Sequence, residues 1–148
     1  MTPGLSIEAD EFVPHPPARV WAALTDHEQL AAWFMPNDFE AEIGHRFTLD
    51  TGQWGPTSCE VLELREPELL RYSWCNGELD SEVTWQLVPE GHGTRVLVTH
   101  AGFDADRPDQ RQAHDGMSGG WRSLVLPELL AFLDQWAGDR ADRRGRGG

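Results

Sequence analysis

The sequence predicts an α+β fold in which an antiparallel sheet packs against one long C-terminal helix. Between Asp109 and Trp136, apolar residues recur at steps of three and four, which is the spacing of one helix face. Most of the preceding chain consists of short alternating runs separated by turn residues, as is typical of antiparallel strands. Because an amphipathic helix must bury its apolar face, we expect the sheet to be its partner.

The first part of the chain is expected to form one strand followed by two short helices. Residues 5–13 alternate in the manner of a strand, and the proline-rich stretch 14–17 ends it. Proline is tolerated in the first turn of a helix, so a helix is expected over 17–24. Asp26 then occupies the position of an N-cap for a second short helix, which Pro36 stops.

Six further strands are expected before the C-terminal helix. They cover residues 39–43, 46–49, 58–64, 69–75, 82–88 and 94–100. Turn residues at 90–93 join the last two strands into a hairpin. This hairpin is expected to place alternate residues of both strands, among them Trp85 and His100, on one buried face.

The turn between residues 64 and 69 fixes the register of the two strands that it joins. Counting outward from the turn pairs Glu63 with Arg71. The same count sets Cys59 across from Cys75 on the polar face and turns Glu60 towards the apolar face. A β-bulge near the turn would reverse some of these positions.

Three residues interrupt the C-terminal helix. Gly119 and Gly120 weaken it locally, and Pro127 leaves a backbone carbonyl without its partner. Two interpretations stay open at this point. The interruptions either shape a helix that leaves room beneath it, or they only let helix and sheet approach closely.

The chain is strongly acidic. It carries 25 Asp and Glu residues against 12 basic residues, all of them Arg, and has a formal net charge of −13 at pH 7. Nucleic acids and anionic membranes are bound through basic faces, so the composition argues against both as partners.

The sequence is expected to form one domain, residues 5–136, followed by a disordered tail at 137–148 that has nothing apolar to pack. No signal region opens the chain, and no apolar run reaches the roughly 18 residues of a membrane span. These features predict a cytoplasmic protein in which Cys59 and Cys75 are reduced thiols.

Seven segments of the chain resemble a known family. They are residues 17–26, 30–34, 44–47, 70–74, 83–85, 93–96 and 120–121. This pattern resembles the heat-shock-protein-90 ATPase activator homologue-like family, within the SRPBCC superfamily of START-related helix-grip proteins. The resemblance covers residues 5–136 and rests on packing and turn positions, so it implies a fold more specifically than a chemistry.

The resemblance implies a curved seven-stranded antiparallel sheet wrapped around the C-terminal helix. In many relatives a hydrophobic cavity between the two holds a lipid, a polyketide or another apolar ligand. The eukaryotic co-chaperones of the family resemble this chain only over their C-terminal domain, and the N-terminal domain that makes much of their chaperone contact has no counterpart here. A chaperone partner is therefore the weaker expectation.

Aromatic residues are the main candidates for a binding site, because large flat side chains suit a pocket for a ring-bearing apolar ligand. Plain core packing is the alternative for each of them. The candidate cavity residues are Trp33, Phe47, Trp54, Tyr72, Trp74, Trp85, His100, Met117 and Trp121.

His100 offers a possible polar group for this cavity. It follows Val96 and Val98 in phase, so it is expected to face inward near the cavity mouth. Beside a carboxylate such as Glu60 or Asp104 it could act as a general base or anchor a ligand. A hydrogen-bonded structural histidine is the alternative.

The favoured hypothesis is a protein that binds a small apolar ligand, without enzymatic activity. No metal-ligand spacing, nucleophile motif or nucleotide fingerprint is present in the sequence, so neither a metal nor a cofactor is expected. Two alternatives remain. One is a cyclase, an aromatase or a hydrolase that uses His100 with a carboxylate, and the other is a co-chaperone-like protein-interaction domain.

Overall fold

The computed structural model describes residues 5–50, 56–76, 79–104 and 106–135. The elements are β1 (Leu5–Val13), α1 (Pro17–Thr25), α2 (His27–Trp33), β2 (Arg46–Asp50), β3 (Pro56–Arg65), β4 (Leu69–Asn76), β5 (Leu79–Glu90), β6 (Gly93–Phe103) and α3 (Pro108–Gly120). The last helix continues through a π-helical turn, Trp121–Val125, into α-helical residues 126–135. Trp54, Trp136 and the expected tail lie outside the described residues.

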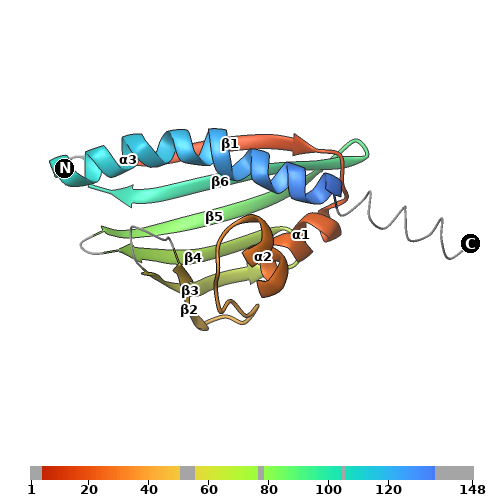
Figure 1. Ribbon diagram of the computed structural model, residues 1–148, viewed down its shortest axis with the longest axis horizontal. Coiled ribbons are helices and arrows are strands. Elements are labelled where there is room, and N and C mark those ends of the chain that lie inside the picture. Colours follow the sequence, from red (N-terminus) through yellow and green to blue (C-terminus); the bar gives the residue numbers. More distant parts are fainter. Residues whose placement is uncertain (1–4, 51–55, 77–78, 105, 136–148) are drawn as a thin grey trace, which may run out of the picture.

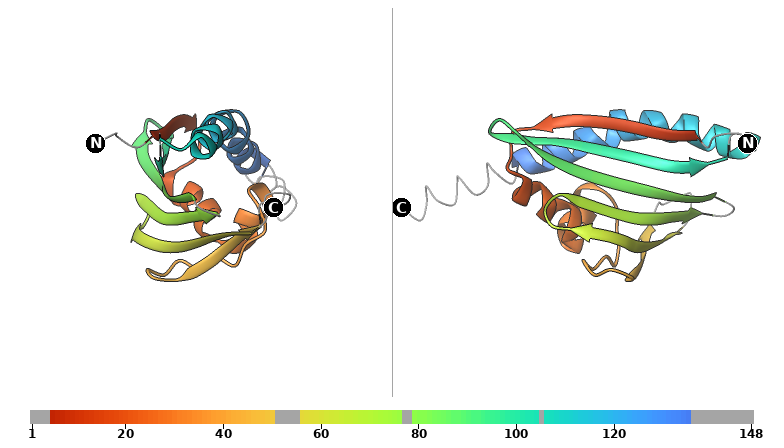
Figure 2. Two further views of the ribbon diagram at one scale, coloured as in Figure 1. Left: turned by 90° about the vertical axis from the view of Figure 1, so that its left-hand side faces the viewer. Right: turned by 180° about the vertical axis from the view of Figure 1, so that it is seen from behind.

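All the strands belong to one antiparallel sheet with the order β1-β6-β5-β4-β3-β2. The sheet curls, and the long helix lies along its β1 and β6 side while α1 and α2 cover the other part of the concave face (Figures 1 and 2). The structure confirms the expected α+β fold, with two short helices after the first strand and a long helix at the end.

The described residues form six strands and not seven, because the strand expected at 39–43 is absent. In this segment backbone N–H groups bond to side chains and not to a neighbouring strand. The Asn37 carboxamide oxygen accepts the Phe39 N–H at 2.9 Å, and the Asp38 carboxylate accepts the Thr48 N–H at 2.6 Å. Asn and Asp readily capture nearby backbone N–H groups in this way, which favours a loop over a strand.

The register between β3 and β4 is partly as expected. Glu63 pairs with Arg71, but a shift between Val61 and Glu63 sets Ser58, and not Cys59, across from Cys75. Cys59 is therefore buried. The prediction for Glu60 is also wrong, since its carboxylate accepts a hydrogen bond from Arg46 on the solvent side, at 3.3 Å. The expected register was counted outward from the turn at residues 64–69. The bulge therefore turns the side chains beyond it, those of Cys59 and Glu60 among them, to the face opposite to the expected one.

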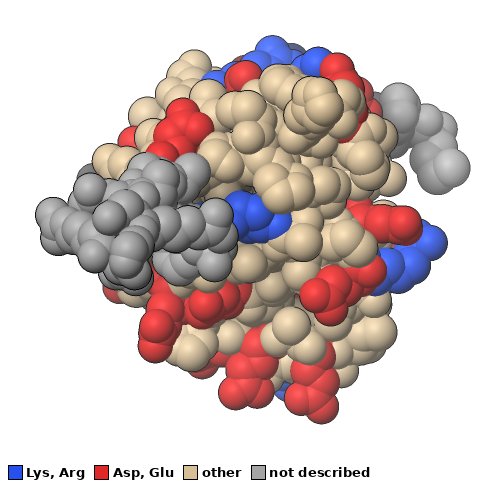
Figure 3. Space-filling view, turned by 90° about the vertical axis from the view of Figure 1, so that its right-hand side faces the viewer, with Lys and Arg blue, Asp and Glu red and all other residues tan. Residues whose placement is uncertain are grey.

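On the face shown in Figure 3 uncharged residues cover most of the surface, and acidic side chains gather mainly over its lower half. On the outer face of the sheet, Arg71 bridges Glu63 and Glu82, with nitrogen-to-oxygen distances of 3.3 and 3.0 Å. Such exposed pairs add little stability individually.

The two short helices form as the sequence indicates. Asp26 caps α2, with its carboxylate accepting the Glu28 N–H at 3.0 Å. Trp33 donates its indole N–H to the Ala23 carbonyl at 2.8 Å, which ties α2 to α1. The Trp33 side chain is thereby held in a buried position between the two helices.

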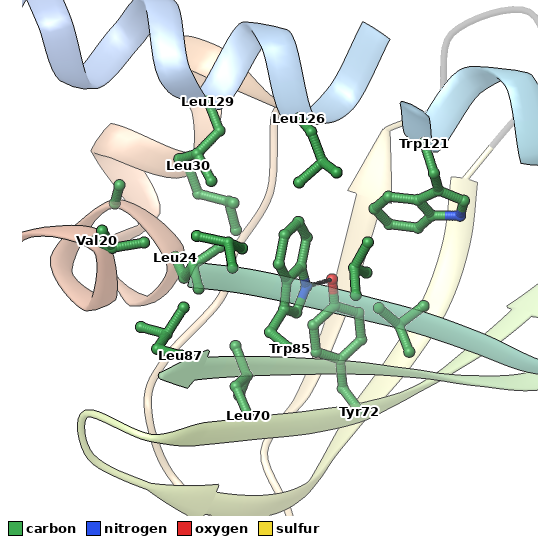
Figure 4. Close-up of a cluster of buried hydrophobic side chains, with 14 of the residues drawn as sticks. Val20, Leu24, Leu30, Leu70, Tyr72, Trp85, Leu87, Trp121, Leu126 and Leu129 are labelled. Atoms are coloured by element: carbon green, nitrogen blue, oxygen red, sulfur yellow. Dashed lines mark hydrogen bonds between the residues drawn. The ribbon is translucent and has the colours of Figure 1, made fainter. Parts of the chain in front are cut away.

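Residues 126–135 contribute almost fully buried leucine side chains to the core. Leu126 and Leu129 project from this segment towards α1, α2 and the sheet, as Figure 4 shows. Trp85 and Tyr72 lie on the sheet below, joined by a hydrogen bond from the indole N–H to the phenol oxygen of 3.1 Å. Close packing of this kind makes large-to-small substitutions costly.

Truncating Leu129 tests this packing. Its side chain is fully buried, so Leu129→Ala is expected to lower the free energy of unfolding by roughly 3 kcal/mol. The matched control is Leu124→Ala on the same helix, where the side chain is 64% exposed and the expected change is below about 0.5 kcal/mol. Urea denaturation of both variants would contradict this account if their losses were equal.

Candidate ligand-binding site

A cavity of about 1050 Å³ lies beside the N-terminal half of the long helix. One helix face supplies a wall, because the contributing residues follow one another at alternating steps of three and one. They are Asp109, Gln112, Ala113, Gly116, Met117 and Gly120. The opposite wall comes from the end of α2 with the loop after it, and from the sheet. Its described members are Ala31, Phe34, Met35, Pro36, Asp50, Thr57 and Trp74.

The glycines of α3 face empty space. A Cβ atom placed on Gly116, Gly119 or Gly120 would meet no atom within 4 Å. These glycines are therefore not needed for a close approach of the helix to the sheet, which was one of the two interpretations of the sequence. Gly116 and Gly120 line the cavity and fit the other interpretation, in which small residues keep the space beneath the helix open, whereas Gly119 is exposed and outside the described wall.

The helix changes its winding where the cavity ends. Residues Trp121–Val125 form a π-helical turn in which the Leu126 N–H bonds to the Trp121 carbonyl. Pro127 follows and has no N–H to give to the helix ladder. The π turn contains one extra residue, which accommodates the hydrogen bond that Pro127 cannot make. The turn also separates the half of the helix that lines the cavity from the half that packs against the core.

Trp121 is fixed by a chain of buried hydrogen bonds. Its indole N–H donates to Nδ1 of His100 at 3.2 Å. Nε2 of His100 must then carry the imidazole proton, which it donates to Ser81 Oγ at 2.8 Å. Ser81 in turn donates to the Trp74 carbonyl at 2.8 Å. The chain joins helix, β6, β5 and β4 with every polar group satisfied.

His100 is held neutral by this arrangement. Burial lowers its pKa to about 4, and the nearby His114 adds to the effect. Protonating Nδ1 would also set its N–H against the indole N–H of Trp121. His100 is fully buried and does not line the cavity, so its geometry is that of the structural alternative and not of a residue at the cavity mouth.

The acid–base pair considered from the sequence does not assemble. Glu60 lies on the outer face of the sheet with Arg46. Asp104 is exposed, and its carboxylate accepts the backbone N–H of Asp106 at 2.9 Å. Neither carboxylate bonds to His100, whose two ring nitrogens are both occupied.

Of the expected cavity residues, Trp74 and Met117 line the wall. Trp54 lies outside the described residues. The remaining ones are buried and outside the described wall of this cavity, and they are Trp33, Phe47, Tyr72, Trp85, His100 and Trp121. Phe47 lines a smaller, separate hollow. Trp121 nevertheless backs the wall, with its ring centroid 6.0 Å from that of Phe34 and 6.1 Å from that of Trp74.

Sequence reasoning missed the contribution of the loop after α2. Phe34, Met35 and Pro36 lie at the end of the predicted second helix, where helical spacing stops and no longer indicates which side chains are covered. The structure also adds polar residues that no periodicity marks, among them Asp50 and Gln112.

A smaller hollow of about 340 Å³ lies around Arg46, Ser58, Cys59 and Cys75. Burial raises the pKa of the Cys59 thiol to about 12, so the thiolate that would react or bind a metal is not formed at neutral pH. No cluster of three or more His, Cys, Asp or Glu side chains suited to a metal occurs in the part of the chain that the structure describes.

Comparisons with known proteins identify the family. The family described as "Activator of Hsp90 ATPase homolog 1-like protein" matches residues 14–134. The chain belongs to this family. A comparison with curated proteins finds no match. None of the described helices has the length and hydropathy to span a bilayer.

Several solved structures share the fold of this Activator of Hsp90 ATPase homolog 1-like chain. Protein MLL2253 from Mesorhizobium loti is 34% identical with a TM-score of 0.80, over 88% of this chain and 98% of its own. Protein BH1534 from Bacillus halodurans is 31% identical with a TM-score of 0.76, over 89% and 99%. CalU16 from Micromonospora echinospora is 26% identical with a TM-score of 0.75, over 97% and 85%. These neighbours have the SRPBCC fold, which confirms the resemblance seen in the sequence.

The buried state of His100 can be tested through pH. Between pH 6.5 and about 4 the unfolded chain binds a proton at His100 that the folded protein excludes, so stability is lost as the pH falls through this window. His100→Gln removes that titration. We expect urea denaturation to show that the wild type loses about 2–3 kcal/mol more than the variant between pH 7 and pH 4.5. Equal losses in the two proteins would show that His100 takes up its proton freely.

Proposed function

We propose that the protein binds a small, apolar, ring-bearing molecule in the cavity beside α3. The observation that carries this proposal is the open face of the helix, where Gly116 and Gly120 look onto a space of about 1050 Å³. A volume of this size lies at the upper end of typical ligand pockets. The proposed site comprises Phe34, Trp74 and Met117 with the small residues between them.

The aromatic residues in the cavity wall favour a ligand that contains an aromatic ring. The rings of Phe34 and Trp74 lie 6.5 Å apart, centroid to centroid, and Trp121 closes the third side of this group. Met117 adds a flexible thioether that adapts to different ring shapes. Burying about 200 Å² of apolar ligand surface here would contribute roughly 5 kcal/mol before the costs of ordering are subtracted.

The alternatives have less support in the structure. The acid–base pair of the enzyme hypothesis is not formed, as described above. A co-chaperone role would need a broad exposed apolar patch. The large exposed apolar side chains among the described residues, Phe12, Ile43, Val88 and Leu124, come from four separate segments.

Ligand binding is tested directly with neutral ring compounds such as 2-naphthol and 4-phenylphenol. At a hundred times the dissociation constant, a bound ligand stabilises the folded state by about 2.7 kcal/mol. We expect the melting temperature, followed by circular dichroism, to rise by roughly 5–10 °C. Absence of any shift across ring compounds of different size would contradict the proposal.

A cavity-filling variant locates the site. Gly116→Leu places a large side chain in the cavity, and we expect it to abolish the ligand-induced shift. The control is Gly119→Leu, on the same helix and equally free of neighbours but outside the described cavity wall. Both variants gain helix propensity of up to about 1 kcal/mol, so neither is expected to unfold the protein. Equal loss of binding in both would place the ligand elsewhere.

A further inference from the structure

The two aromatic residues of the cavity wall pack against a third ring that lies outside the wall. The ring of Trp121 lies 6.0 Å from that of Phe34 and 6.1 Å from that of Trp74, centroid to centroid. Both distances are within the range at which aromatic rings attract one another. Trp121 is buried and does not belong to the described wall. Its orientation therefore constrains both wall rings, although Trp121 does not line the cavity.

The orientation of Trp121 depends on the protonation state of His100. An indole ring has one hydrogen-bond donor, and that of Trp121 bonds to Nδ1 of His100 at 3.2 Å. Nδ1 accepts a hydrogen bond only in the neutral tautomer that carries its proton on Nε2. Ser81 selects this tautomer, because its Oγ accepts a hydrogen bond from Nε2 at 2.8 Å while its own proton goes to the Trp74 carbonyl at 2.8 Å.

This chain of hydrogen bonds ends at a residue of the wall. Ser81 of β5 is the direct cross-strand partner of Trp74 of β4, so the chain runs from Trp121 to the backbone of a residue that lines the cavity. The His100 ring also packs between the two indoles, with its centroid 5.3 Å from that of Trp74 and 5.9 Å from that of Trp121. His100 and Ser81 are almost completely buried, and breaking a buried hydrogen bond is costly. The chain therefore favours a single arrangement of these rings.

We infer that His100 and Ser81 are positioning residues of the ligand site, which act through Trp121 and the Trp74 backbone to fix the wall rings and so make the site select flat ligands. Stacking between rings depends on their separation and tilt, whereas the burial of apolar area is not directional. A fixed aromatic wall therefore adds affinity for a flat ring and little for a puckered one of similar size. This inference rests on the proposed function and names the residues that determine the selectivity of the site.

The test compares 2-naphthol with trans-decahydro-2-naphthol, which has the same carbon skeleton and hydroxyl group but saturated, puckered rings. Isothermal titration calorimetry at pH 7, where both probes are uncharged, gives the affinity of each. We expect the wild type to bind 2-naphthol roughly three- to tenfold more tightly, since aromatic pairing adds affinity beyond that of area burial.

Two substitutions break the chain of hydrogen bonds. Ser81→Ala removes the group that selects the His100 tautomer, and it is expected to abolish most of the preference for 2-naphthol. The affinity for the saturated probe is expected to change little, because the apolar area of the wall stays the same. Should Ser81→Ala fail to fold, Trp121→Phe serves in its place. It keeps a ring beside the wall but has no N–H for His100, so it is also expected to reduce the preference.

Tyr72→Phe is the matched control. It also removes a buried hydroxyl group that belongs to the hydrogen bonds of the aromatic core, since the Tyr72 oxygen accepts the indole N–H of Trp85 at 3.1 Å. Trp85 packs against Trp121, with 5.6 Å between the ring centroids, but Tyr72 takes no part in the chain through His100. Tyr72→Phe is therefore expected to keep the preference for 2-naphthol, even if it lowers the stability of the protein.

Every other outcome overturns the inference. If the wild type binds both probes equally, or if the chain-breaking variant keeps the full preference, the chain does not determine selectivity although the cavity still binds ring compounds. If Tyr72→Phe lowers the preference as much as Ser81→Ala does, any loosening of the aromatic core has this effect and the chain has no special role. If the wild type binds neither probe, the proposed function fails together with the inference.

Discussion

The hydrogen bond between Trp121 and His100 holds the C-terminal helix at the point where its surroundings change. On one side of it, Leu126, Leu129 and Leu133 are almost fully buried against the sheet and the two short helices. On the other side, the helix presents small, polar and flexible residues to a cavity. Since the bond is the first link of a satisfied chain through Ser81 to the Trp74 carbonyl, the helix is fixed to three strands there. The packed half can therefore supply the stability while the open half stays unfilled.

The fold was largely predictable because it depends on patterns that extend over many residues. The alternation in the strands and the helical spacing after Asp109 are set by burial on one face, and the structure follows both. The errors came from single local interactions. Asn37 and Asp38 bond to backbone groups and replace an expected strand by a loop, and one bulge after Val61 turns Cys59 inward and Glu60 outward. Such events leave no periodic trace in a sequence.

The site was less predictable than the fold, for a physical reason. Hydrophobicity shows that Trp85 or Trp121 is buried, but it does not distinguish a residue that fills the core from one that borders a space. Glycines carry that information only once the backbone is placed, because the same residue allows close packing in one protein and leaves a void in another. The two walls of the cavity could not be predicted from a pattern either, since Phe34 and Met117 are far apart in the chain and line one cavity only in the folded structure.

The central claim is that the space beneath α3 is hollow and open to apolar molecules, while the space beneath residues 126–135 is full. Xenon binds in apolar cavities without requiring a charged partner or a particular cavity shape. Its binding therefore reports directly which of the two spaces is empty. Under xenon pressure, methyl nuclear magnetic resonance is expected to show shifts concentrated at Ala31, Ala113 and Met117, with Leu129 and Leu133 unchanged. Shifts spread evenly over both groups, or none at the first three residues, would contradict the account.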